Sequence, residues 1–97
     1  MQLLVEPEAE ADLAAACDWY DQLRSGLGDE FTKEFEFVAR QILQFPNMWR
    51  IVQEDARQAA LKRFPYYVFY VVDEDLVSVV AVIHKHRDPE VWQHRLT

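Results

Sequence analysis

The sequence predicts an α+β fold in which an antiparallel helical hairpin packs on one side of a three- to four-stranded antiparallel sheet. In the first half of the chain, apolar residues recur every three or four positions, which is the period of an amphipathic helix. In the second half, residues 66–72 and 76–83 form two apolar runs rich in Val, Ile, Tyr and Phe, which suit a half-buried strand. Because 97 residues can build one core and not two, residues 1–97 are expected to form a single domain.

The first half predicts a short strand followed by two helices. Residues 2–5 form a short apolar run, which we expect at an edge of the sheet or beside the distant hairpin. Proline suits the first turn of a helix, so the first helix should begin at Pro7 and end within residues 25–28. Asp29 is expected to cap the second helix, which Pro46 stops. The apolar faces consist of Ala9, Leu13, Ala16, Tyr20, Leu23 and Leu27 in the first helix, and of Phe31, Phe35, Val38, Ile42 and Phe45 in the second.

The second half predicts the strands and a short terminal helix. A short strand is expected at residues 50–52 and a longer one at residues 57–64, with Pro65 marking the next turn. The acidic link at residues 73–75 is too short for anything but a hairpin.

Both faces of the last strand should be covered, because residues 79–83 are all apolar. Asp88 and Pro89 are a cap and a first residue that suit a short C-terminal helix.

Several classes of protein do not fit this composition. Cys17 is the single cysteine, so no intramolecular disulfide can form, and we expect no metal site. There is no Gly-rich phosphate loop, nucleophile elbow or zinc signature, and no cofactor is expected. The N-terminus lacks the pattern of a signal peptide and no apolar run approaches the length of about 20 residues that spans a membrane, so we expect a cytoplasmic protein.

Charge is distributed unevenly along the chain. The formal net charge is -7, and residues 1–49 hold ten acidic and three basic side chains, whereas residues 50–97 hold seven of each. The acidic half would repel nucleic acid, and its acids are most simply a solvated helix surface. The strand region leaves open a local positive patch, formed by Arg57, Lys62, Arg63, Lys85, Arg87 and Arg95.

The residues around the end of the last strand are the strongest candidates for a site. His84 and His86 are two positions apart, so they would share one face of a strand, and Lys85 and Arg87 would share the other. Two histidines can bind a metal or exchange protons. The more ordinary interpretation is that one imidazole donates to a backbone carbonyl and the other is solvated.

Short motifs are distributed in order along nearly the whole chain. They are Ala15-Ala16-Cys17-Asp18-Trp19-Tyr20, Gly26-Leu27-Gly28 with Phe31, Phe45-Pro46, Lys62-Arg63-Phe64-Pro65-Tyr66 with Tyr70, His84, Arg87-Asp88-Pro89 and Trp92. In this order and at this spacing they resemble the RelE/ParE superfamily of bacterial toxins from type II toxin–antitoxin systems, a group also labelled plasmid stabilisation proteins.

The resemblance implies a toxin and a cognate antitoxin, a segment of which folds as it binds. ParE-like members poison DNA gyrase and catalyse no reaction. RelE-like members enter the ribosome and cleave messenger RNA with basic residues and a C-terminal Tyr or His. A non-toxic paralogue that acts as an interaction domain is a third possibility, and either a homodimer or a toxin–antitoxin hetero-oligomer fits the resemblance.

The sequence favours the ParE-like function. The chain is acidic, whereas binding to the ribosome favours a basic surface. Trp92 stands where the RelE-like pattern carries its terminal catalytic Tyr, and an indole is neither an acid nor a base. His86 stands at an arginine position of that pattern. In an RNA-cleaving protein, phosphate would be held by Arg63 and Arg87, and protons would be moved by His84 or His86.

We expect five basic residues and one tryptophan to bind the target or the antitoxin. The candidates are Arg57, Lys62, Arg63, Lys85, Arg87 and Trp92. Antitoxin segments in this family are often acidic and amphipathic, so their contacts are expected across the sheet and the basic C-terminal region.

Overall fold

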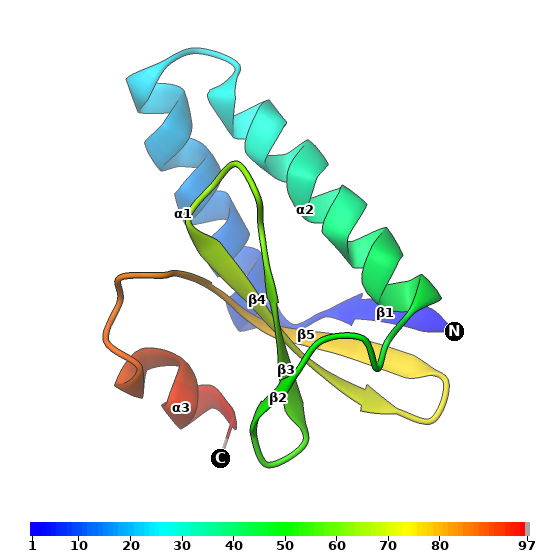
Figure 1. Cartoon of the computed structure of the whole chain (residues 1–97). Coiled ribbons are helices and arrows are strands. Elements are labelled where there is room, and N and C mark those ends of the chain that lie inside the picture. The colour runs from blue at the N-terminus through cyan, green and yellow to red at the C-terminus, as the bar shows by residue number, and fades with distance from the viewer. Residues whose placement is uncertain (97) are drawn as a thin grey trace.

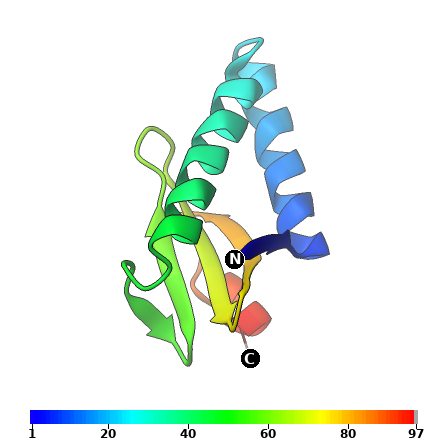
Figure 2. The ribbon, with the colours of Figure 1, turned by 90° about the vertical axis from the view of Figure 1, so that its right-hand side faces the viewer.

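The structure is a computed structural model, and it describes residues 1–96. The predicted α+β architecture is confirmed, with two long helices on one face of a sheet and a short helix on the other (Figures 1 and 2). In chain order the elements are β1 (Gln2–Val5), α1 (Pro7–Leu23), α2 (Leu27–Gln44), β2 (Ile51–Gln53), β3 (Ala56–Ala60), β4 (Tyr66–Asp73), β5 (Leu76–His84) and α3 (Glu90–Leu96).

The sheet has five strands, one more than the three to four that the sequence predicts. Its five strands lie in the order β1-β5-β4-β3-β2, and β2 to β5 form the expected antiparallel meander. β1 lies at the edge beside β5, as predicted, but it runs parallel to β5, with Gln2 opposite Leu76 and Val5 opposite Val79. A parallel pair requires a long crossover connection, and the whole segment between the two strands supplies it.

The junction between the two helices differs from the prediction. α2 begins at Leu27, and its N-cap is Gly26 with a φ of 89°, so Asp29 lies inside the first turn and is not the cap. Glycine reaches this left-handed conformation without the steric cost that a side chain would bring. The Gly28 N–H donates to the Asp21 carboxylate at 2.7 Å. A Cβ at Gly28 would lie 2.7 Å from the carbonyl oxygen of Cys17, so only glycine fits this close contact.

The strand predicted at residues 57–64 is shorter in the structure. β3 ends at Ala60, and the backbone N–H groups of Lys62 and Arg63 beyond it donate to the Glu34 carboxylate on α2 and not to a strand. The link predicted at residues 73–75 is also shorter, since Asp73 pairs with Leu76 and only two residues form the turn.

The core lies on both faces of the sheet. The larger cluster fills the space between the helical hairpin and the sheet, and its most deeply buried large side chains include Phe31, Ile42, Val68 and Tyr70. A smaller cluster on the opposite face consists of Phe69, Ala81 and Ile83, covered by Val91, Trp92 and Leu96 of α3. The prediction that both faces of β5 are covered is therefore confirmed, with Val80 the one half-buried residue of residues 79–83. No helix within residues 1–96 is long and apolar enough to cross a membrane.

Candidate functional site

The end of β5 and the short helix α3 contain most of the predicted site residues. β5 ends at His84, the chain turns over residues 85–89, and α3 then packs on the sheet. Trp92 stacks on Phe69 with ring centroids 4.6 Å apart and an interplanar angle of 18°. The indole of Trp92 is therefore part of the contact that seats α3 on the sheet.

Arg95 anchors the other end of α3 to the first long helix. Its guanidinium binds both carboxylate oxygens of Asp12, with Nη2 2.9 Å from Oδ1, and its Nε lies 3.3 Å from Glu8. Asp12 also accepts a hydrogen bond from the backbone N–H of Val82 at 2.9 Å. Val82 lies on β5 beyond Val79, the last β5 residue that pairs with β1. The hydrogen bond with Asp12 raises the pKa of Arg95. The sequence could not reveal this network, because its two ends are 83 residues apart.

His84 and His86 lie close together, but not as neighbours on one strand face. His86 belongs to the turn, because β5 ends at His84, and the turn brings the two imidazole rings to 5.4 Å. The backbone N–H of His86 donates to Nδ1 of His84 at 3.0 Å. Burial lowers the pKa of His84, and the nearby His86 and Arg87 lower it further. A neutral ring with Nδ1 as acceptor carries its proton on Nε2, so His84 offers a hydrogen-bond donor to its surroundings.

A small hollow of about 140 Å³ lies beside His84. It is lined by Asp12, Ala15, Ala16, Tyr66, Val82, Ile83, His84 and Arg87. Tyr66 packs edge-on against the His84 ring at 5.2 Å, and burial raises the pKa of its phenol. The carboxylate in the hollow, Asp12, is already bound to Arg95. The hollow therefore presents a phenol, an imidazole N–H and a guanidinium, which together suit an anion better than a cation.

Arg63 does not line this hollow, and it contacts the second long helix. Its guanidinium pairs with Glu30 of α2 at 2.6 Å, and Arg24 pairs with the same carboxylate at 3.0 Å. Both hydrogen bonds lower the pKa of Glu30, and the bond from Arg63 has the larger effect. Arg63 is thus engaged within the chain, and it shares the carboxylate of Glu30 with Arg24.

The remaining predicted cations serve different contacts. Arg57 donates to the carbonyl oxygens of Trp49 at 2.6 Å and Asn47 at 3.3 Å, so it fixes the loop before β2. The ammonium of Lys85 lies 5.3 Å from the centroid of the Tyr67 ring. The six predicted binding residues are consequently spread over separate places in the fold, and only Lys85, Arg87 and Trp92 belong to the β5–α3 region.

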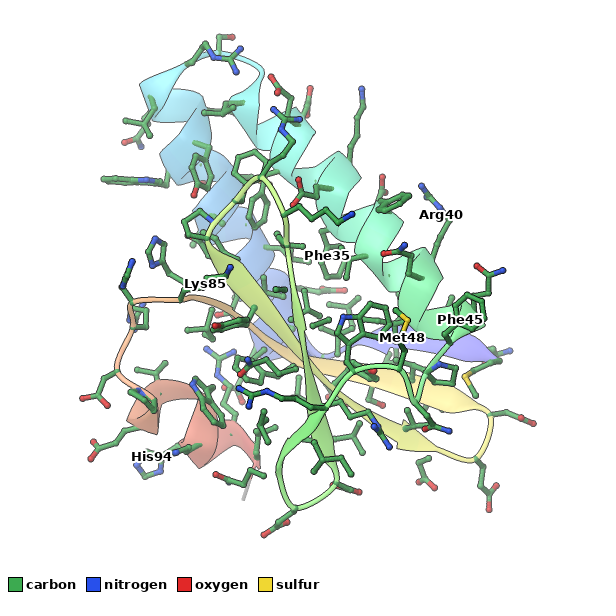
Figure 3. All side chains as sticks on the ribbon, viewed as in Figure 1. Phe35, Arg40, Phe45, Met48, Lys85 and His94 are labelled. Carbon is green, nitrogen blue, oxygen red and sulfur yellow. The ribbon has the colours of Figure 1, made fainter. Side chains whose placement is uncertain are left out.

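A second surface feature escaped the prediction. A groove of about 430 Å³, called here the β3 groove, is lined by Glu34, Phe37, Val38, Gln41, Met48, Trp49, Ala60, Lys62 and Arg63. Phe37 and Met48 are 47% and 58% exposed. The signal in the sequence was Phe37, which stands outside the apolar stripe of the second helix. Figure 3 shows Phe35 on the sheet side of that helix, Arg40 on its outer side, and Met48 near Phe45.

Phe45 was assigned to the core stripe, and this assignment is wrong. α2 ends at Gln44, and the ring of Phe45 is 54% exposed. Once the helix ends, its periodicity no longer sets the direction of the side chain.

The comparison with protein families decides the classification of this fold. The family model for the ParE toxin of type II toxin–antitoxin systems, parDE, matches residues 3–89. The chain belongs to the ParE toxin family. The resemblance to the RelE/ParE superfamily inferred from the motifs is thereby confirmed.

Solved structures agree with the ParE fold. The chain is similar to a structure of the chromosomal ParDE TA system from P. aeruginosa, with a TM-score of 0.78 and 20% sequence identity over 87% of this chain and 95% of the other. A comparison with curated protein sequences gives no significant match. The family match stops at residue 89, so α3, with Trp92 and Arg95, lies outside the region that the ParE model describes.

Proposed function

We propose that this ParE-family toxin inhibits growth by binding DNA gyrase without catalysing a reaction, and that a cognate antitoxin neutralises it. The observation that carries the proposal is the stacking of Trp92 on Phe69 at 4.6 Å. This is the position where an RNA-cleaving relative needs an acid or a base, and here the side chain is neither and is used for packing.

The other predicted catalytic residues are consistent with a binding function. His84 has its Nδ1 occupied by a backbone N–H, so its Nε2 donates and cannot take a proton from an attacking hydroxyl. Arg63 is paired with Glu30. A phosphate at Arg63 would therefore compete with the carboxylate of Glu30 for the guanidinium.

The turn after β5 is the proposed contact with the target. Lys85, His86 and Arg87 are exposed there, and residues 1–96 contain no ion pair for Lys85 or Arg87. In an acidic chain these side chains form a local cationic projection, which suits an acidic surface of a partner. Charge reversal by Lys85→Glu with Arg87→Glu is expected to abolish inhibition, whereas Lys33→Glu on the exposed part of α2 is the matched control.

The hollow beside His84 supports one alternative, a ribosome-dependent endoribonuclease. Its phenol, imidazole and guanidinium could hold a phosphodiester. Of the four candidate residues Arg63, His84, His86 and Arg87, His84 and Arg87 line the hollow. In that case the double change His86→Ala and Arg87→Ala would abolish both toxicity and message cleavage.

Induction of the chain alone in a bacterium separates the two functions. We expect DNA synthesis to stop in the first minutes while translation continues, and the purified chain to inhibit supercoiling by gyrase. Early loss of translation with cut messages would replace this proposal with the endoribonuclease. Normal growth together with unaffected supercoiling would leave a non-toxic interaction domain.

A further inference from the structure

An exposed apolar stripe, called here the α1 stripe, follows the surface of the first helix. It consists of Ala15, Trp19 and Leu23, which are four residues apart and therefore lie above one another on the helix. The side chains of Trp19 and Leu23 are 58% and 62% exposed. Leu23 was assigned to the core face of this helix, and this assignment is wrong. The core does not use the outer part of the stripe, and exposed apolar surface of this kind marks a site of association.

The α1 stripe is continuous with the cationic turn after β5. Ala15, at one end of the stripe, lines the hollow beside His84 together with Arg87. Trp19 lies one helical turn beyond Ala15, which is a rise of about 6 Å along the axis. Lys85 and Arg87 are exposed on the turn. One surface of the molecule therefore joins apolar side chains of α1 to the cations that follow β5.

The acidic side chains of α1 do not cancel these cations. Glu8 and Asp12, which precede the stripe, are both bound to Arg95. Asp18 is directly before Trp19 in the sequence, so it is rotated by about 100° around the helix and lies off the stripe. The two cations of the turn form no ion pair within residues 1–96. Apolar side chains beside uncompensated cations suit a partner that is apolar and acidic.

We propose that the α1 stripe receives an amphipathic helix of the target, with the apolar face of that helix on Trp19 and Leu23 and its acidic side chains at the turn after β5. This inference rests on the proposed function, in which the target is DNA gyrase. The backbone groups of α1 bond within the helix, so the stripe offers no edge for an added strand. Side chains one turn apart form a ridge, and a ridge fits the groove of another helix.

A second copy of the chain fits this surface less well. Parallel packing of the two α1 helices would bring the two cationic turns together. Antiparallel packing centred on Trp19 would place the turn of one copy opposite Arg24 of the other. Arg24 and Arg63 share the single carboxylate of Glu30, so that end of α1 is cationic too. Like charges therefore oppose both arrangements.

Affinity for purified gyrase tests the apolar part of the surface. Trp19→Ala should weaken binding by about tenfold or more and weaken the inhibition of supercoiling in parallel, because a tryptophan at the centre of an interface carries much of its binding energy. Phe45→Ala is the matched control, since this ring is 54% exposed at the end of α2, and it should bind as the wild type does. Leu23→Ala should weaken binding as well, which keeps the test valid if circular dichroism shows that Trp19→Ala is misfolded.

Salt separates the apolar contact from the charged one. The loss of affinity in Trp19→Ala should be the same at low and high salt, because the contact is apolar. The loss in the double variant Lys85→Glu and Arg87→Glu should shrink as salt screens the charges. A loss in Trp19→Ala that disappears at high salt would overturn the apolar contact.

Cross-linking with a carbodiimide tests the nature of the occupant, because this reagent joins an ammonium to a neighbouring carboxylate as an amide. We expect Lys85 to couple to an acidic residue of gyrase within a helix that has apolar residues three or four positions apart. Lys85→Arg is the matched control, since it keeps the charge and cannot couple. A cross-linked segment without an apolar face would overturn the proposed occupant.

The outcomes separate the failure of this inference from that of the proposed function. If the wild-type chain neither binds nor inhibits gyrase, the gyrase part of the proposed function fails, and this inference fails with it. If the wild type inhibits gyrase and Trp19→Ala and Leu23→Ala inhibit it equally well, this inference alone fails. A dimer of the chain by sedimentation that Trp19→Ala converts to a monomer would identify the stripe as a self-association site and overturn gyrase as its occupant.

Discussion

Tyr70 illustrates how one side chain joins distant parts of the sequence. Its ring is fully buried on β4, and its hydroxyl donates to the carbonyl of Pro46 at 2.7 Å. The bond fixes the point where the chain leaves α2 and enters the loop before β2. Burial raises the pKa of Tyr70 to about 12 from its usual 10.0, because the phenolate would lose its hydration.

Tyr70→Phe tests this bond and the titration together. At neutral pH the free energy of unfolding should fall by about 1 kcal/mol, because the Pro46 carbonyl loses its donor. Between the unfolded pKa of 10.0 and the folded pKa of about 12, the unfolded state loses a proton that the folded state keeps, so the wild type should lose stability as pH rises. The variant should lack this component. Denaturant unfolding at several pH values measures both, and equal alkaline slopes would contradict the assignment.

At the scale of elements, α3 is held by an aromatic stack at one point and an ion pair at another. Arg95→Gln should lower the free energy of unfolding by about 2 kcal/mol, because it removes charge-assisted hydrogen bonds between partly buried groups. It should also free α3, which tryptophan fluorescence would report through Trp92. Glu8→Gln is the matched control, since Glu8 is the exposed partner of Arg95, and its effect should be near zero. Equal losses in both variants would show that Asp12 is not the anchor.

Local patterns predicted the elements well and their contacts less well. Helical periodicity, Pro7 and Pro46 located both long helices, because these signals lie within a few residues of the structure they determine. The cap at Gly26 and the end of β3 at Ala60 depend on partners elsewhere in the chain, such as Asp21 and Glu34. A pattern in one segment cannot contain that information, so these boundaries were wrong.

The candidate site was predicted least well, because charge alone does not reveal partners. Arg57 and Arg63 are counted among the cations of a binding patch, yet each is engaged within the chain, Arg57 with loop carbonyls and Arg63 with Glu30. The residues that the pattern did pick out, Lys85 and Arg87, lie on an exposed turn. Phe37 was visible as an aromatic residue outside its helical stripe, which is the signal that could have found the β3 groove.

At the scale of the whole molecule, the two faces of the sheet have unequal cores, and removal of residues 90–97 tests whether they are independent. The larger cluster lies between the helical hairpin and the sheet and includes no residue of α3, whereas the smaller cluster is covered by Val91, Trp92 and Leu96. We therefore expect the shortened chain to fold, with circular dichroism showing a loss of helix no larger than the seven residues of α3. Its free energy of unfolding should fall by about 5 kcal/mol, because three half-buried apolar side chains are lost and Asp12 loses its ion pair with Arg95.

The uncovered face should bind a hydrophobic dye, because Phe69, Ala81 and Ile83 lose their cover. Trp92→Ala in the full chain is the matched control, since it removes the stack on Phe69 and keeps the rest of α3. It should cause a smaller loss of stability and weaker dye binding than the truncation. A shortened chain that is unfolded would mean that α3 and the larger cluster form one cooperative unit, although the match to the ParE family stops at residue 89.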